Sequence, residues 1–127
     1  MRNFIVVFLR FFILLCLSLG VALPVHARQD PGLPTISIGE LPEEARHTIL
    51  LIRTGGPFPY PKDGVVFGNY EGVLPKQKRG YYHEFTVKTP GVRNRGARRI
   101  ITGGEVRAPS EFYYTEDHYQ SFKRVKE

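Results

Sequence analysis

Hydrophobic and polar positions divide this chain into a strongly apolar beginning and a longer, mixed remainder. From Phe11 to Leu23 almost every residue is apolar, two arginines precede this run, and Val25-His26-Ala27 follows it in a small-x-small pattern. A basic start, an apolar run and such a site are typical of a secretory signal peptide, so we expect residues 1–27 to be removed on export. A retained membrane anchor is the alternative, because Phe4 to Leu9 nearly extends the apolar run to spanning length.

The first periodic pattern after residue 27 is helical. Apolar or small side chains recur at three- and four-residue spacing, on one helix face, at Ala45, Thr48, Ile49 and Ile52. We predict a helix from about Pro42 to Arg53, because proline suits a first helical position and Gly55-Gly56 can end the helix. Residues 28–40, which contain two prolines and two glycines, are expected to form an extended lead-in to a domain spanning 41–127.

Beyond the helix the pattern changes to short alternating runs separated by turn signals such as Asp63-Gly64 and Pro90-Gly91. The strands expected from these runs are 65–67, 81–88, 98–102, 112–115 and 119–125. One helix followed by a series of strands is the α+β pattern. We therefore expect one N-terminal helix packed on a twisted antiparallel β-sheet.

Alternation along the strands separates the polar candidates from the core. Tyr82, Glu84 and Thr86 share one strand face, whereas the more apolar set at 81, 83, 85 and 87 should face the helix. Arg95 and Arg99 are an even number of residues apart on the next strand, so their side chains share a face. Arg99 can therefore project from the same open face as Glu84. His118 lies in the loop before the last expected strand, at the rim of that face.

Charge and cysteine content narrow the partners and the means of stabilisation. The 127 residues carry a net charge of +6, and removal of residues 1–27 leaves 16 basic against 12 acidic residues, about +4. That balance suits a polyanion such as nucleic acid. The single cysteine, Cys16, lies in the expected signal peptide, so the exported domain has no disulfide and depends on its core.

The residues of the open face are those that cleavage of an RNA phosphodiester requires. RNA supplies its own nucleophile, the 2′-hydroxyl. Glu84 can accept the proton of that hydroxyl, and a protonated His118 can donate one to the departing 5′-oxygen. Arg95 and Arg99 can hold the phosphate through bidentate contacts. No metal cofactor is expected, because the histidines beyond residue 27 lack the spacing of metal ligands.

Each of these residues also has a purely structural interpretation. A glutamate near arginines is often a cross-strand ion pair of small energy, and a lone histidine in a loop is often structural. The alternative function is therefore a non-catalytic basic module that binds RNA or another polyanion. The two functions differ at Glu84, because a carboxylate among phosphate-binding arginines would repel the ligand of a simple binding module.

Several ordered motifs resemble those of one known family. They are LPEEA (41–45), GPFPY (56–60), DGVVF (63–67), GYYHE (80–84), TPG (89–91), RGARRI (95–100) and YYTEDHY (113–119). With these motifs the chain is similar, from Leu41 to about Val125, to the guanyl-specific microbial ribonucleases, the barnase-like family, and in particular to their streptomycete branch. The resemblance implies a small metal-independent α+β endoribonuclease that cleaves single-stranded RNA after guanosine.

The resemblance also assigns roles to residues. Glu84 matches the family's general base and His118 its general acid. Arg95 and Arg99 match its phosphate-binding arginines. The segment 65–71 matches the guanine-recognition loop. There Glu71 would accept bonds from guanine N1 and N2, and backbone groups of Gly68, Asn69 and Tyr70 would contact O6. Phe67 and Tyr119 would flank the base, in agreement with the way single-stranded RNA is generally read.

Two departures from the family pattern concern this loop and the stability of the domain. Many relatives carry an arginine at the position of Tyr70 and a larger polar residue at that of Gly68, so Tyr70 can offer a stacking ring instead. The streptomycete relatives also carry a disulfide that residues 28–127 cannot form. We expect a secreted or periplasmic monomer, not held at the membrane after signal cleavage, and a barstar-like protein inhibitor if the enzyme serves as a toxin.

Overall fold

The computed structural model describes residues 32–127, and residues 33–127 form one compact unit. The expected signal peptide, residues 1–27, lies outside the described residues. No helix within 32–127 is both long and apolar enough to span a membrane.

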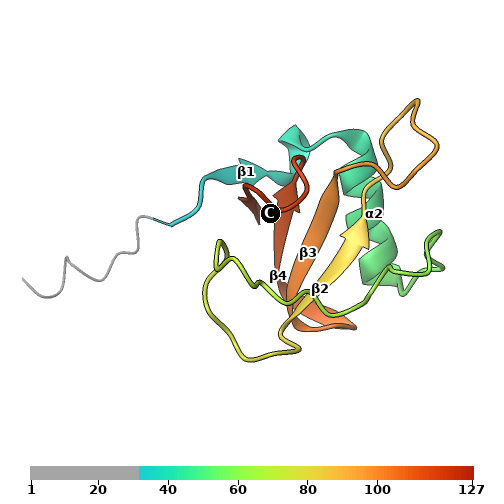
Figure 1. Ribbon diagram of the computed structural model, residues 1–127. Coiled ribbons are helices and arrows are strands. Elements are labelled where there is room, and N and C mark those ends of the chain that lie inside the picture. The colour runs from blue at the N-terminus through green and yellow to red at the C-terminus, as the bar shows by residue number, and fades with distance from the viewer. Residues whose placement is uncertain (1–31) are drawn as a thin grey trace, which may run out of the picture. The chain divides into compact units, whose positions relative to one another are not determined.

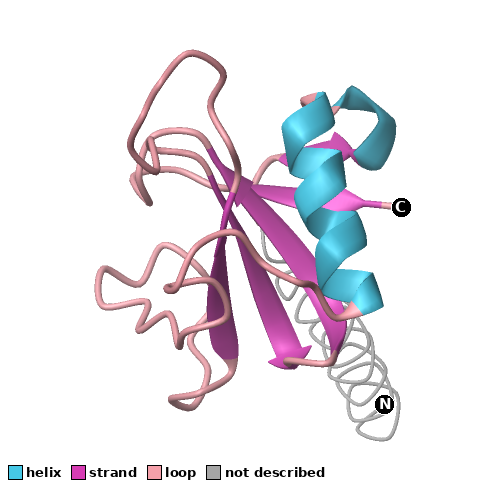
Figure 2. Ribbon diagram, turned by 90° about the vertical axis from the view of Figure 1, so that its right-hand side faces the viewer, coloured by secondary structure: helices cyan, strands magenta, loops and turns pink. Residues whose placement is uncertain are grey.

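The compact unit consists of one long helix and a five-stranded sheet (Figure 1). Its elements are β1 (Thr35–Ser37), the 3-10 helix η1 (Ile38–Glu40), α2 (Glu43–Thr54), β2 (Tyr82–Thr86), β3 (Arg99–Glu105), β4 (Ala108–Thr115) and β5 (Lys123–Lys126). The strand order is β1-β5-β4-β3-β2, and every pair is antiparallel except β1 with β5. Figure 2 shows α2 along one face of the sheet and long loops on the other side. The predicted α+β fold is confirmed.

Helix α2 has the boundaries and the buried face that its sequence predicts. Pro42 precedes the first turn, two glutamates lie in that turn, and Gly55 ends the helix in the left-handed region at φ 82°. The four side chains of the predicted face are buried against the sheet. Thr48 also donates a hydrogen bond of 3.1 Å to the carbonyl of Thr86, so the helix is tied directly to β2.

Alternation of side chains distributes two apolar clusters over the two faces of the sheet. The cluster under α2 includes Phe85, Val87 and Ile100, as the alternation predicts. Tyr81, which is predicted on the same face, precedes β2 and packs against the cluster on the opposite face instead. A second cluster on the opposite face is formed by Leu74, Tyr82, Ile101, Tyr113 and Phe122. Leu74 is contributed by the long loop before β2. The face expected to be open is therefore only partly open, because this loop covers one part of it and leaves the part around Glu84.

Several predicted boundaries are wrong. Residues 65–67 do not form a regular strand; they make one isolated bridge, Val66 to His83, flanked by backbone bonds to β2. Most of the expected strand 119–125 is a loop, and β5 covers only Lys123–Lys126. The β3–β4 hairpin is longer than expected and has a register shift at Gly103/Gly104. Within the expected lead-in, β1 pairs with β5, an interaction between distant segments that local pattern does not reveal.

Candidate active site

Glu84 occupies the middle of β2, opposite Ile101 of β3, on the face away from α2. Its side chain is only 13% exposed. One carboxylate oxygen accepts a hydrogen bond from the hydroxyl of Tyr119, and the other lies 3.8 Å from a guanidinium nitrogen of Arg95. The carboxylate is thus held between an aromatic hydroxyl and a cation, with part of its surface still open to a ligand.

Two arginines lie near this carboxylate: Arg95, from the loop before β3, contacts it directly, and Arg99, the first residue of β3, lies over the ring of Tyr119. Arg95 donates from Nε and Nη2 to the hydroxyl of Thr86, at 3.1 and 2.9 Å. Thr86 is the next residue after Glu84 on the same face of β2, and these bonds orient the guanidinium of Arg95. Arg99 is 2% exposed, and its Nη1 donates to three carbonyls of the loop 95–98 at 2.8–3.3 Å. Its buried Nε has no hydrogen-bond partner among the described residues. A buried guanidinium with an unused donor is suited to an anion.

The loop between β4 and β5 presents His118 and Tyr119 in a strained backbone conformation. Both residues lie in the left-handed region, at φ 55° and 75°, which costs free energy for side chains of this size. Asp117 holds this conformation: its carboxylate accepts bonds from the hydroxyl of Thr115 at 2.9 Å and from the backbone N–H of Ser121 at 2.9 Å. The Ser121 hydroxyl also donates to it and is the main cause of its lowered pKa.

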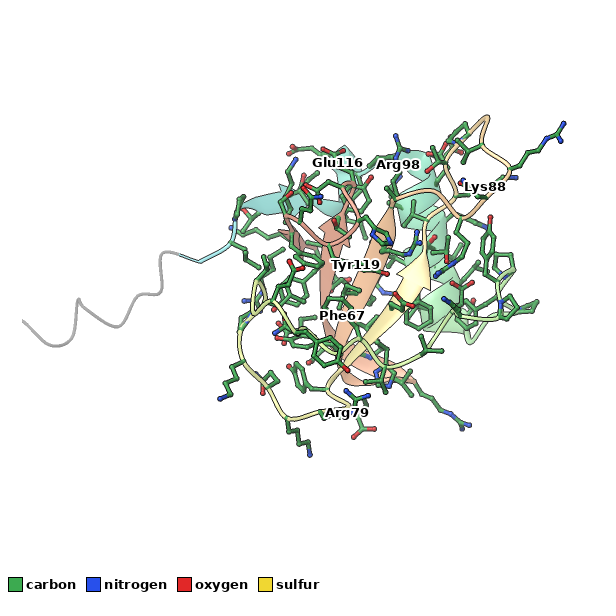
Figure 3. All side chains as sticks on the ribbon, in the orientation of Figure 1. Phe67, Arg79, Lys88, Arg98, Glu116 and Tyr119 are labelled. Carbon is green, nitrogen blue, oxygen red and sulfur yellow. The ribbon has the colours of Figure 1, made fainter. Side chains whose placement is uncertain are left out.

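Tyr119 joins the two halves of the site. Its ring centroid lies 4.9 Å from that of Phe67 and 4.8 Å from that of His118, while its hydroxyl reaches Glu84. Figure 3 shows Tyr119 and Phe67 together in front of the sheet. Burial, followed by the bond to Glu84, raises the pKa of Tyr119 to about 12, so the phenol stays protonated near neutral pH.

Beside Tyr119 lies a pocket of about 270 Å³. Its lining consists of Phe67, Asn69, Tyr70, Glu71, Val73, His118, Tyr119 and Phe122. The loop that forms its outer wall is closed by Asn69, which adopts φ 52° and exchanges side-chain bonds with the backbone of Leu74 at 3.0 and 3.2 Å. Asparagine tolerates this left-handed conformation better than most residues. The pocket therefore has a rigid wall that carries an exposed carboxylate, Glu71.

The structure brings the sequence-predicted residues together with one exception. Of the four predicted catalytic residues, Glu84, His118 and Arg99 contact or lie near Tyr119, and Arg95 lies beside Glu84. Five of the six predicted base-binding residues line the pocket; the sixth, Gly68, lies behind Tyr70. His83 points to the other face, where burial lowers its pKa. In the described part of the chain, no group of three His, Cys, Asp or Glu residues could hold a metal ion. Two larger cavities, about 380 and 530 Å³, contain none of the predicted site residues.

Sequence reasoning missed the residues that orient the site. Thr86 and Asp117 contact the arginine and the histidine loop, but neither has a motif of its own. Thr86 could have been found from its parity with Glu84 on the same strand. Asp117 could have been found from its spacing to Thr115 and Ser121, because such short polar triplets often close turns.

Comparison with known proteins gives a consistent result. A family model for ribonucleases matches residues 25–126. Guanyl-specific ribonuclease Sa from Kitasatospora aureofaciens is 57% identical over 91 residues, which is 72% of this chain and 92% of that protein. Guanyl-specific ribonuclease St from Saccharopolyspora erythraea is 52% identical over 92 residues, covering 72% of this chain and 87% of that protein.

Solved structures agree with these relatives. The structure of ribonuclease Sa2 in complexes with mononucleotides matches with a TM-score of 0.72 and 48% identity, over 77% of this chain and 98% of that one. Ribonuclease Sa2 with guanosine-2′-cyclophosphate matches with a TM-score of 0.69 and 47% identity, over 75% and 97%. The fold and the site thus define an enzyme that acts on RNA. The chain belongs to the ribonuclease family, within its guanyl-specific microbial branch, so the predicted resemblance is confirmed.

Proposed function

We propose that this chain cleaves single-stranded RNA after guanosine by transphosphorylation to a 2′,3′-cyclic phosphate, followed by hydrolysis, with Glu84 as base and His118 as acid. The observation that carries the proposal is the position of Tyr119. Its ring lines the base-sized pocket while its hydroxyl bonds to Glu84, so a base in that pocket has its ribose beside the carboxylate.

In the first step Glu84 takes the proton of the 2′-hydroxyl, whose oxygen attacks phosphorus. Arg95 and Arg99 hold the phosphate: Arg95 lies 3.8 Å from Glu84, and the guanidinium of Arg99 lies 6.0 Å from the ring centroid of Tyr119, so both cations are near the reacting groups. His118 protonates the departing 5′-oxygen. In the second step water opens the cyclic ester while His118 acts as base and Glu84 as acid, which restores both groups.

Guanine selection is assigned to the loop 67–71. Glu71 accepts hydrogen bonds from guanine N1 and N2, donors that adenine does not present in the same arrangement. Backbone N–H groups at 68–70 bind O6, and Phe67 and Tyr119 flank the base. Support comes from the position of these residues around one pocket, and from ribonuclease Sa2, whose structure contains guanosine-2′-cyclophosphate in one case and 3′-GMP in another.

The proposed setting is extracellular or periplasmic. The basic start, the apolar run 11–23 and the pattern at 25–27 support export. Residues 33–127 fold as one compact unit, which we propose to be monomeric. An exported ribonuclease endangers its producer before export. A barstar-like inhibitor in the producing cell is therefore proposed as a partner, with an acidic surface that matches the arginines of the site.

The test is digestion of the purified domain, residues 28–127, with GpU, ApU, CpU and UpU in the presence of EDTA. Rapid cleavage of GpU alone, with guanosine 2′,3′-cyclic phosphate as the first product, is the expected result. Cleavage of all four would reject guanine selection and retain the acid–base mechanism. A folded sample that binds RNA and cleaves none of them would reject the enzymatic proposal.

A further inference from the structure

The residue Tyr70 of the recognition loop is held in place although it is almost fully exposed. It is 86% exposed, yet its hydroxyl accepts a hydrogen bond of 3.0 Å from Nη1 of Arg79. Its ring also lies directly against the backbone of Gly68: a Cβ added there would be 2.5 Å from the ring atoms Cε2 and Cζ. Only a residue without a side chain leaves room for the ring in this position.

The two contacts come from different segments, and both act on the outer part of the ring, near its hydroxyl. Gly68 supports the ring from within the recognition loop, whereas Arg79 precedes β2, the strand that carries Glu84. In Figure 3, Arg79 lies on the far side of Phe67 from Tyr119. The ring of Tyr70 is therefore fixed between the loop that reads the base and the segment that leads into the catalytic strand.

A fixed, exposed aromatic ring at the wall of a pocket is suited to a flat apolar ligand face. Tyr70 lines the same pocket as Phe67 and Glu71, and most of its surface is open to solvent. Stacking of a nucleobase on an aromatic side chain is worth about 1–3 kcal/mol. A ring that is already oriented loses less side-chain entropy when the base arrives, so more of this energy is available for binding.

We propose that Tyr70 is a base-binding residue of this enzyme, and that Gly68 and Arg79 act as positioning residues for its ring. The inference rests on the proposed function, because it assigns the pocket to the guanine of the substrate. It goes further because it assigns a joint role to three residues: Gly68 leaves room for the ring of Tyr70, and Arg79 bonds to its hydroxyl. Both departures of this loop from the family pattern then have one physical cause.

The experiment measures the Kd of 3′-GMP and the kcat and KM for GpU. Tyr70→Ala is expected to weaken 3′-GMP about 10-fold and to raise KM for GpU similarly, with kcat changed less than about threefold, since the ring contacts the base before and during reaction. Gly68→Ala should have a similar effect, because its Cβ displaces the ring, and should add nothing in the Tyr70→Ala background.

Arg79 is tested by a double-mutant cycle. Arg79→Ala and Tyr70→Phe each remove the same hydrogen bond, so each is expected to weaken 3′-GMP about two- to fivefold and the double variant no more than either alone. Lys78→Ala is the matched control: it removes a neighbouring positive charge that makes no bond to Tyr70, and should leave the Kd of 3′-GMP within about twofold. Melting curves for every variant confirm that the domain is folded.

Three results would overturn the proposal. One is an unchanged Kd in Tyr70→Ala. Another is a loss in Lys78→Ala equal to that in Arg79→Ala, which would show a general charge effect. The third is a Tyr70→Ala variant that cleaves the trinucleotide ApGpU more weakly than wild type but cleaves GpU and binds 3′-GMP normally. Tyr70 would then contact the base upstream of guanosine and not the guanine. Wild-type protein that neither binds 3′-GMP nor cleaves GpU would instead reject the proposed function itself, so the two failures are distinguishable.

Discussion

Two nearly buried carboxylates on the same face of the sheet offer a direct test of the base. Glu84 and Glu111 have side chains that are 13% and 14% exposed, and each lies near one arginine, at 3.8 and 3.6 Å. Each also accepts hydrogen bonds from tyrosine hydroxyls: Glu84 from Tyr119, and Glu111 from Tyr81 and Tyr113. They differ in position, because only Glu84 lies beside the base pocket. Replacing each by glutamine keeps the shape and one acceptor oxygen while removing the charge.

Glu84→Gln is expected to affect turnover and not stability, whereas Glu111→Gln is expected to affect stability and not turnover. Glu84→Gln should lower kcat on GpU by about 10²–10⁴, equivalent to about 2.7–5.4 kcal/mol of transition-state free energy. Its free energy of unfolding should change by less than about 1 kcal/mol, since the hydroxyl of Tyr119 keeps an acceptor and the ion pair is long. Glu111→Gln should lose about 1–2 kcal/mol of stability, because two hydrogen bonds to a charged acceptor become neutral ones. Its kcat should stay within about threefold.

Stopped-assay kinetics on GpU and urea unfolding of the same samples measure both quantities. Glu84 is not the base if Glu84→Gln retains kcat within about tenfold of wild type. The role of Glu84 is also contradicted if Glu111→Gln loses as much turnover as Glu84→Gln while remaining folded, since the position of the carboxylate would then be irrelevant.

The other predictions concern the acid, the pH profile and the histidine loop. His118→Ala should slow GpU cleavage about 10²–10⁴-fold but should recover most of the rate on guanosine 3′-(4-nitrophenyl phosphate), whose leaving group needs no proton; no recovery would contradict the acid role. The kcat/KM profile should be bell-shaped, with no limb from Tyr119 because burial raises its pKa to about 12, so Tyr119→Phe should keep both limbs. The Ser121 hydroxyl lowers the folded-state pKa of Asp117, so Asp117 stabilises the fold above its ordinary range near 3.8 and loses this contribution as pH falls. Melting of Asp117→Asn should accordingly depend less on pH between about 2 and 5 than melting of the wild type does.

Local pattern predicts those parts of the fold that local interactions determine. The boundaries of α2 follow from Pro42 and Gly55, and the face of Glu84 follows from alternation along a single strand. The same alternation places Arg99 on that face correctly, but it cannot show that Arg99 is buried. That burial depends on three carbonyls of a loop, whose conformation no periodic pattern describes.

The errors arise where pairing is distant or where side chains determine the backbone. β1 is three residues long and obtains its pairing from β5, about ninety residues later, so nothing near Ile36 in the sequence predicts it. The segment 119–125 is apolar enough to be read as a strand. Its first half instead forms a turn, because Asp117 accepts bonds from Ser121 and holds His118 and Tyr119 at positive φ.

The pairing of β1 with β5 has a consequence for the time at which activity arises during synthesis. The sheet is completed only when Lys123–Lys126 are available, because within residues 32–127 β1 pairs only with β5, and β4 lacks its second neighbour until then. The loop that presents His118 ends immediately before these residues, so it has no downstream anchor in a chain that is still growing. We therefore expect the His118 loop to reach its final position only after β5 has joined the sheet, so that full activity arises late in synthesis.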